Sequence, residues 1–348
     1  AFSSIRPSAH AGTHNAGRWD NYENKGNLMK YGHVPGIEKR ISRVAQGAVM
    51  LTSEAEAEGF ALLDAAYEHG CNAFDTAHVY GNGECDRVLG RWVAARGLRD
   101  KVVVIGKGAH HNADRKRVTP FDITADIYDT LARMRTDYID LYLLHRDDPT
   151  VPVGPIVETL HDHKEAGRIH AYGGSNWTTD RIAEANAFAR AHGLTPFAAS
   201  SPHFSLAEQI EAPWDDCVTI TGAANAAQRE WYLREQMPLF CWSSLAGGWF
   251  SGRLTRANQA EHADTLYMRC YGCEANWRRL ERAVSLGKVR GLSAAQIALA
   301  YVLNQDFNVF ALVAAYAPEE FAACAAAVSV SLSKEEMAWL DLQNDERP

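Results

Sequence analysis

The chain has 348 residues, of which 47% are hydrophobic, and this length and composition fit one large α/β domain with additions. The formal net charge is −8 and the Lys and Arg residues are scattered, which argues against a nucleic-acid partner. No apolar run reaches the roughly 18–20 residues that span a bilayer, so we expect no membrane partner. Seven cysteines, an odd number spread over a long chain, favour free thiols in a reducing, cytoplasmic compartment.

Residues 1–36 are rich in Gly, Asn, His and Ser, and we expect an irregular N-terminal extension there, followed by one domain over 37–348. From residue 43 onward, short apolar segments alternate with helical patterns. Eight segments predict strands that are buried on both faces: 43–50, 72–76, 102–107, 138–145, 169–175, 196–201, 238–243 and 309–314. Helices are predicted between and after them: 53–69, 84–96, 122–134, 155–166, 179–192, 224–235, 293–304 and 318–328.

Eight alternating strands and helices predict an α/β fold of the (β/α)8 TIM-barrel type. A doubly wound open sheet is the rival, but no G-x-G-x-x-G sequence lies between a strand and a helix. Ser53 and Glu56 predict a capping box at the first helix. Two long loops, 202–223 after the sixth strand and 244–292 after the seventh, would overhang one face of the barrel.

Four polar residues lie at or just beyond the C-terminal ends of successive strands: Asp75, Tyr80, Lys107 and His145. In a parallel barrel these strand ends share the face on which active sites are built. An acid, a phenol, an amine and an imidazole together suggest proton transfer to a carbonyl oxygen. Tyr80 is the best proton donor, and a nearby Lys107 would lower the pKa of its phenol. Asp75 would pair with Lys107, and His145 would orient the carbonyl.

The chain resembles the aldo-keto reductases over roughly residues 40–330. The segments that carry the resemblance are 74–81 (FDTAHVYG), Lys107, 143–149 (LLHRDDP), 173–176 (GGSN) and 242–248 (WSSLAGG), in this order. It is nearer to bacterial reductases and to members similar to potassium-channel β subunits than to aldose reductase. The resemblance implies a barrel oxidoreductase that moves a hydride between a nicotinamide cofactor and an aldehyde, ketone or alcohol, with Asp75, Tyr80, Lys107 and His145 as its catalytic residues.

The resemblance also implies how a cofactor is bound. Ser175 and Asn176 would hold the nicotinamide carboxamide, Trp242 would stack on the ring, and residues 245–254 would fold over the pyrophosphate. The cofactor-binding residues implied in this way are Ser175, Asn176, Ser201, Trp242, Ser243, Leu245, Gly247, Arg253 and Glu320.

Two of these positions depart from the family pattern. Ser201 aligns where Gln is usual, and Glu320 lies close to the Arg expected at the 2′-phosphate of NADP. A carboxylate there would repel a phosphate and could accept a ribose hydroxyl instead. The cofactor is therefore expected to be NADP(H) or NAD(H).

Two other functions stay open at this level. One is a non-catalytic module that senses nicotinamide cofactors, similar to a channel β subunit. The other is a metal-dependent barrel hydrolase using His110, His145, Asp147 and Asp148, although adjacent histidines rarely aim at one ion and no metal site is expected. The substrate is not named by the sequence, and the extension at 1–36 is compatible with an oligomer.

Overall fold

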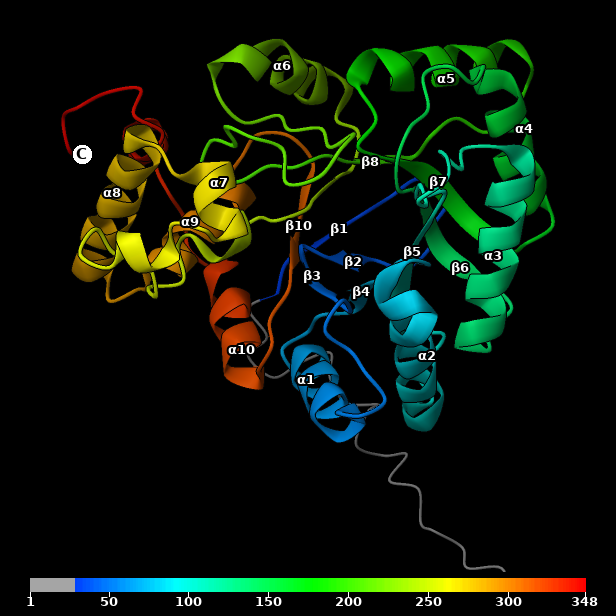
Figure 1. Cartoon of the computed structure of the whole chain (residues 1–348), viewed down its shortest axis with the longest axis horizontal. Coiled ribbons are helices and arrows are strands. Elements are labelled where there is room, and N and C mark those ends of the chain that lie inside the picture. The colour runs from blue at the N-terminus through cyan, green and yellow to red at the C-terminus, as the bar shows by residue number, and fades with distance from the viewer. Residues whose placement is uncertain (1–28) are drawn as a thin grey trace, which may run out of the picture.

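The computed structural model describes residues 29–348, and these form a closed barrel of parallel strands surrounded by helices (Figure 1). Around the barrel the strands run in the order β10, β3, β4, β5, β6, β7, β8, β9. Their bounds are β3 (Val44–Gly47), β4 (Ala73–Asp75), β5 (Val103–Gly108), β6 (Ile139–Leu144), β7 (Ile169–Ser175), β8 (Ala199–Ser201), β9 (Leu239–Cys241) and β10 (Val309–Val313). The predicted (β/α)8 barrel is confirmed, and each predicted strand overlaps an observed one.

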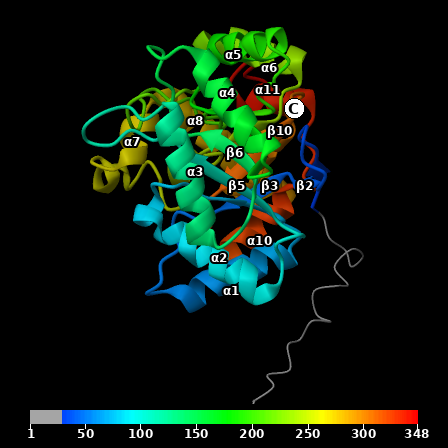
Figure 2. The ribbon, with the colours of Figure 1, turned by 90° about the vertical axis from the view of Figure 1, so that its right-hand side faces the viewer.

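The helices cover the outside of the barrel, as two perpendicular views show (Figures 1 and 2). The helices that follow the barrel strands or connect them are α1 (Glu56–Glu68), α2 (Glu84–Arg96), α3 (Pro120–Met134), α4 (Val153–Glu165), α5 (Thr179–Ala191), α6 (Ala226–Glu235), α9 (Ala294–Leu303) and α10 (Pro318–Ala327). Three further helices are α7 (Leu266–Tyr271), α8 (Glu274–Arg290) and α11 (Lys334–Leu340). Within residues 29–348, no helix combines the length and the apolar character needed to cross a membrane.

Apolar side chains from every second strand position point inward and fill the barrel interior. Ala73, Ile105, Leu143 and Ala199 belong to this cluster, and the rings of Phe240 and Phe310 stack within it at 4.5 Å. (Phe310 also lies under the guanidinium of Arg43.) The interior is therefore a packed core, and a ligand can approach only at the ends of the barrel.

A short hairpin closes the N-terminal end of the barrel. Strand β1 (Tyr31–Gly32) pairs antiparallel with β2 (Ile41–Ser42), and Val34 and Ile37 between them are buried in the same cluster as the barrel interior. The expectation that the irregular extension reaches residue 36 is thus wrong for residues 29–36, which belong to the folded domain. Residues 1–28 lie outside the described residues.

The predicted capping box at the start of α1 is also wrong. The helix begins at Glu56, its N-cap is Ala55, and no side chain of the described part of the chain caps it. Arg91 from α2 binds both proposed capping residues, through Nε to Glu56 at 2.6 Å and Nη2 to Ser53 at 2.6 Å. The Glu56 carboxylate bonds Arg91 of the neighbouring helix and does not cap its own helix, because a hydrogen bond between two charged groups is stronger than one to a neutral backbone N–H.

Candidate active site

The polar groups of the candidate site continue the side-chain rows that fill the barrel. In a strand every second side chain points to the same face. Two residues after the interior positions Ala73, Ile105 and Leu143 come Asp75, Lys107 and His145. The alternation therefore aims these three polar groups at the barrel axis, directly above the apolar filling.

The segment after β4 brings Tyr80 over the same point. The backbone N–H of Thr76 donates to Ile105 O at 2.8 Å, and that of His78 donates to Lys107 O at 2.7 Å. The Thr76 hydroxyl donates to Asp86 at 2.6 Å, and a 3₁₀ turn, Tyr80–Gly83, follows. These bonds continue the pairing of β4 with β5 beyond the strand, so Tyr80 is held beside Lys107.

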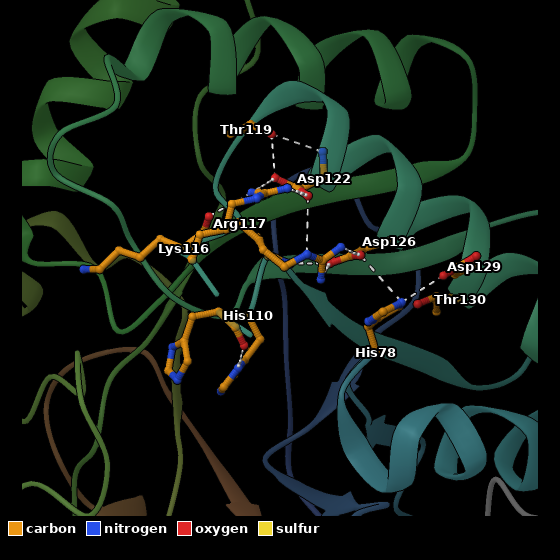
Figure 3. A network of polar contacts seen from close by, with 12 residues as sticks. His78, His110, Lys116, Arg117, Thr119, Asp122, Asp126, Asp129 and Thr130 are labelled. Atoms are coloured by element: carbon orange, nitrogen blue, oxygen red, sulfur yellow. Dashed lines mark hydrogen bonds and ion pairs between the residues drawn. The ribbon is translucent and has the colours of Figure 1, made fainter. Parts of the chain in front are cut away.

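A network of charged side chains on α3 anchors this segment and the loop after β5 (Figure 3). His78 Nε2 lies 3.0 Å from Asp129 and 3.5 Å from Asp126. Arg117, from the loop after β5, lies 2.6 Å from Asp126 and 3.3 Å from Asp122. This network was not expected from the sequence, although the spacing of its three acids, four and three residues apart, places them on one face of a helix.

The four predicted catalytic residues are brought together in one cluster. Lys107 Nζ donates to Asp75 and, at 3.2 Å, to Thr76 O. Lys107 Nζ lies 5.2 Å from the centre of the Tyr80 ring, and the Tyr80 and His145 rings meet edge to face at 5.7 Å. Asp75, Lys107 and His145 are buried, whereas Tyr80 keeps partial exposure, as a group that must meet a ligand requires.

Burial dominates the protonation of this cluster. Desolvation raises the pKa of the Tyr80 phenol above its ordinary value; the charge of Lys107 lowers it and that of Asp75 raises it. The expectation of a lowered phenol pKa is thus wrong for the net shift, although the direction of the Lys107 contribution is as expected. Burial by itself would lower the pKa of Lys107, but Asp75 and Tyr80 raise it, so the ammonium stays charged at neutral pH.

His145 is neutral at physiological pH. Burial first, and then the charges of Lys107 and Arg146, hold the pKa of this imidazole well below its ordinary value. Its Nδ1 atom is buried and has no hydrogen-bond partner among residues 29–348. The side chain is therefore an uncharged hydrogen-bonding group that faces Tyr80.

Four of the predicted cofactor-binding residues lie beside this cluster: Ser175, Asn176, Ser201 and Trp242. Asn176, in the left-handed backbone region with φ of 58°, accepts bonds at its Oδ1 from Trp242 Nε1 at 3.1 Å and from Val218 N at 3.0 Å. Its Nδ2 donates to His145 O at 3.2 Å and to Ser175 Oγ at 3.3 Å. The Asn176 amide is thus fully engaged by protein groups.

Ser201 is the free hydrogen-bonding group beside it. Ser175 Oγ donates to Ser201 O at 2.9 Å, but Ser201 Oγ is buried and has no partner among the described residues. A buried hydroxyl without a partner costs free energy. Ser201 therefore offers one unoccupied donor and acceptor at the edge of the site.

The loop after β9 has an unusual backbone. Ser243, Ala246 and Gly247 have positive φ values of 49°, 52° and 62°, with Leu245 between them at −106°. The change from a right-handed backbone at Leu245 to a left-handed one at Ala246 turns neighbouring N–H groups toward one side and can form an anion-binding nest. Further along this loop, the exposed Arg253 donates from Nε to Ser251 Oγ at 3.3 Å.

Glu320 lies on the exposed first turn of α10. Its carboxylate accepts a hydrogen bond from the backbone N–H of Tyr316 at 2.8 Å. The bond holds the negative charge close to the C-terminal end of β10, on the same face as the other predicted site residues.

The residues of the metal-dependent alternative do not converge. His110 and His145 have ring centroids 4.8 Å apart, but Asp147 pairs with Arg181 at 3.2 Å instead. Within residues 29–348, no group of three or more His, Cys, Asp or Glu side chains is arranged to hold a metal ion.

A parallel barrel with this polar cluster at its C-terminal end is the architecture of an oxidoreductase of the TIM-barrel class. The family model of the aldo/keto reductase family matches residues 43–344. This chain belongs to the aldo/keto reductase family.

The chain is similar to named members of that family. A norsolorinic acid reductase of Emericella nidulans is 30% identical over 302 residues, which cover 80% of this chain and 70% of the relative. An aryl-alcohol dehydrogenase (NADP+) of Phanerodontia chrysosporium is 26% identical over 347 residues, 88% of this chain and 84% of the relative.

Solved structures share the fold. A glycerol dehydrogenase of Gluconobacter oxydans superposes with a TM-score of 0.69 at 23% identity, covering 91% of this chain and 98% of its own. An aldo-keto reductase of Klebsiella pneumoniae in complex with NADPH superposes with a TM-score of 0.66 at 24% identity, covering 87% and 91%.

The Asp75–Lys107 pair provides a stability prediction. Asp75→Leu alone leaves a buried unpaired ammonium and should lower the free energy of unfolding by about 3–5 kcal/mol. The double variant Asp75→Leu/Lys107→Met removes both charges and should recover most of that loss. Urea unfolding of the wild type, both single variants and the double variant gives the four unfolding free energies of this double-mutant cycle. If the losses of the two single variants simply add in the double variant, Asp75 and Lys107 do not interact directly.

Proposed function

We propose that this chain transfers a hydride between a nicotinamide dinucleotide and a small carbonyl or alcohol substrate. The observation that carries the proposal is the cluster in which a partly exposed phenol, Tyr80, meets a charged Lys107 and a neutral His145. The reaction is the reduction of an aldehyde or ketone, or the reverse oxidation of an alcohol.

Each residue of the cluster has a distinct task. Tyr80 donates a proton to the carbonyl oxygen during reduction, and Lys107 stabilises the phenolate that remains. Asp75 fixes the direction of the Lys107 side chain. The neutral His145 places a hydrogen bond on the carbonyl oxygen. In alcohol oxidation the Tyr80 phenolate accepts the proton.

The residues around the cluster fit a nicotinamide dinucleotide, which supplies the hydride when it is bound. The free hydroxyl of Ser201 can bond the carboxamide, in the place where the family pattern has Gln. The half-buried ring of Trp242 is available for stacking, and Ser175 and Asn176 hold it and Ser201 in position. The backbone around Leu245 and Gly247 can bind the pyrophosphate, with Ser243 and Arg253 at its edges.

Relatives support an aromatic substrate panel as the starting point. One relative is an aryl-alcohol dehydrogenase, and others carry the same name in Saccharomyces cerevisiae. Substituted benzaldehydes and the matching benzyl alcohols are therefore the first compounds to test.

The first prediction concerns the proton donor. Tyr80→Phe removes the phenolic proton without changing the shape of the ring, and should lower kcat for aldehyde reduction about 100- to 10,000-fold. Tyr316→Phe, at an exposed position, is the matched control and should retain full activity. Steady-state kinetics measure both variants. Unchanged turnover by Tyr80→Phe would show that Tyr80 is not the proton donor. A wild type that binds the cofactor but turns over no substrate would favour a cofactor-sensing module.

The second prediction concerns the cofactor. The Glu320 carboxylate repels a 2′-phosphate, so we expect NADH to bind the wild type at least as tightly as NADPH. Glu320→Arg should tighten NADPH binding roughly tenfold, because it replaces repulsion by attraction. Glu335→Arg, on the first turn of α11, makes the same charge change elsewhere and should not alter the preference. Quenching of tryptophan fluorescence measures the binding of NADH and of NADPH to each protein. A wild type that binds NADPH much more tightly than NADH would refute the proposed repulsion between Glu320 and the 2′-phosphate.

A further inference from the structure

Arg146, which directly follows the catalytic His145, is a buried arginine with almost none of its hydrogen-bonding capacity used. Its side chain is only 4% exposed. A guanidinium has five N–H donors. Within residues 29–348, Arg146 donates one hydrogen bond, from Nη1 to His145 O at 2.9 Å, and its Nε is buried without a partner.

Within residues 29–348, the positive charge of Arg146 also has no carboxylate partner. Among the described residues, no carboxylate lies within ion-pair distance of it. The adjacent Asp147 pairs with Arg181 at 3.2 Å, and Asp216 on the loop after β8 pairs with Lys116 at 2.9 Å. A buried unpaired guanidinium destabilises a fold, and an anionic ligand that pairs with it would offset that cost.

Arg146 directly follows His145 and its guanidinium donates to the His145 carbonyl oxygen at 2.9 Å, so it lies beside the active-site cluster. Its charge contributes to the pKa shifts of Tyr80, His145 and His110, and also to that of Cys217 in the loop after β8. Trp177 Nε1 donates to the Arg146 backbone carbonyl at 3.2 Å and fixes the turn that carries it. The arginine thus borders the space in which a carbonyl substrate would meet Tyr80.

The phosphates of the cofactor are not suitable partners for Arg146. In the closed barrel, β6, which ends just before His145, is four strands away from β10 in either direction and three strands away from β9. The proposed pyrophosphate loop and Glu320 follow β9 and β10. The anion that Arg146 can reach belongs to the substrate.

We propose that Arg146 is a specificity-determining residue that pairs with a carboxylate of the substrate, so that the preferred substrates are aldehydes or ketones bearing an acidic group. A planar guanidinium with free parallel N–H groups can bind a carboxylate in bidentate fashion. The proposal rests on the proposed function and names the substrate class of the same site.

The test compares acids with their neutral esters. The probes are 2-, 3- and 4-carboxybenzaldehyde and the methyl ester of each, so that three isomers sample three distances between the carbonyl and the charge. For wild-type protein with saturating cofactor, kcat/KM should favour at least one acid over its ester. Arg146→Met should lower that acid-to-ester ratio about 10- to 100-fold, and Arg146→Lys should retain part of it, because a hydrogen-bonded charge pair is lost or weakened.

Two controls separate binding from long-range charge and from folding. Lys116→Met removes one positive charge from the neighbouring loop and should leave the acid-to-ester ratio unchanged. Arg146→Met removes an unpaired buried charge, so its Tm should equal or exceed that of the wild type. A structural arginine would show the opposite: a lower Tm and equal losses on acid and ester, which would overturn the proposal.

A wild type that reduces neutral aldehydes and prefers no acid would refute the role of Arg146 and leave the proposed function standing. If no aldehyde is turned over, the proposed function fails, and Arg146 is then tested by binding alone. Benzoate should quench the tryptophan fluorescence of wild type more strongly than of Arg146→Met, whereas methyl benzoate should not distinguish them. Equal benzoate binding by both proteins would overturn the proposal.

Discussion

The buried pair of Asp75 and Lys107 is the interaction on which the rest of the site depends. Strands β4 and β5 are neighbours in which Asp75 is in register with Ile105, and Lys107 lies two residues further along, on the same interior face. Parallel pairing in a closed barrel thus brings the acid and the amine together before any catalytic demand is considered. The pair keeps one ammonium charged in a nearly dry environment, where its field on the neighbouring Tyr80 is strong.

Much of this arrangement could be predicted from the sequence, because side chains alternate between the two faces of a strand with a period of two residues. Polar residues at or next to the C-terminal ends of short apolar strands lie at the C-terminal face of the barrel. Residues of this kind are Asp75, Lys107, His145, Ser175 and Ser201. The hairpin at β1 and β2 could not be predicted in the same way. Its strands have two residues each, too few to show a period, and they are stabilised by the burial of Val34 and Ile37 against a barrel end that exists only after folding.

The pKa of Tyr80 and the environment of the Arg146 charge could not be predicted from the sequence, because both depend on how deeply the groups are buried. The pKa of Tyr80 is a difference between desolvation, which raises it, and the attraction of Lys107, which lowers it, and the depth of burial decides the sign. In the sequence, Arg146 is one of three consecutive charged residues, Arg146, Asp147 and Asp148, and nothing in that pattern marks it as buried. Only the structure shows that its neighbour Asp147 pairs with Arg181, and that the guanidinium is buried without a carboxylate partner among residues 29–348.

The most direct test of the account is the pH dependence of hydride transfer, measured in a single turnover of carbonyl reduction. Tyr80 must be protonated, and burial keeps it so beyond the ordinary phenol pKa of about 10, while His145 stays neutral far below the ordinary imidazole pKa of about 6.5. The rate should therefore be level from about pH 6 to pH 9 and fall only in stronger alkali. A rate that falls with an apparent pKa near 6 to 8 would contradict Tyr80 as the proton donor.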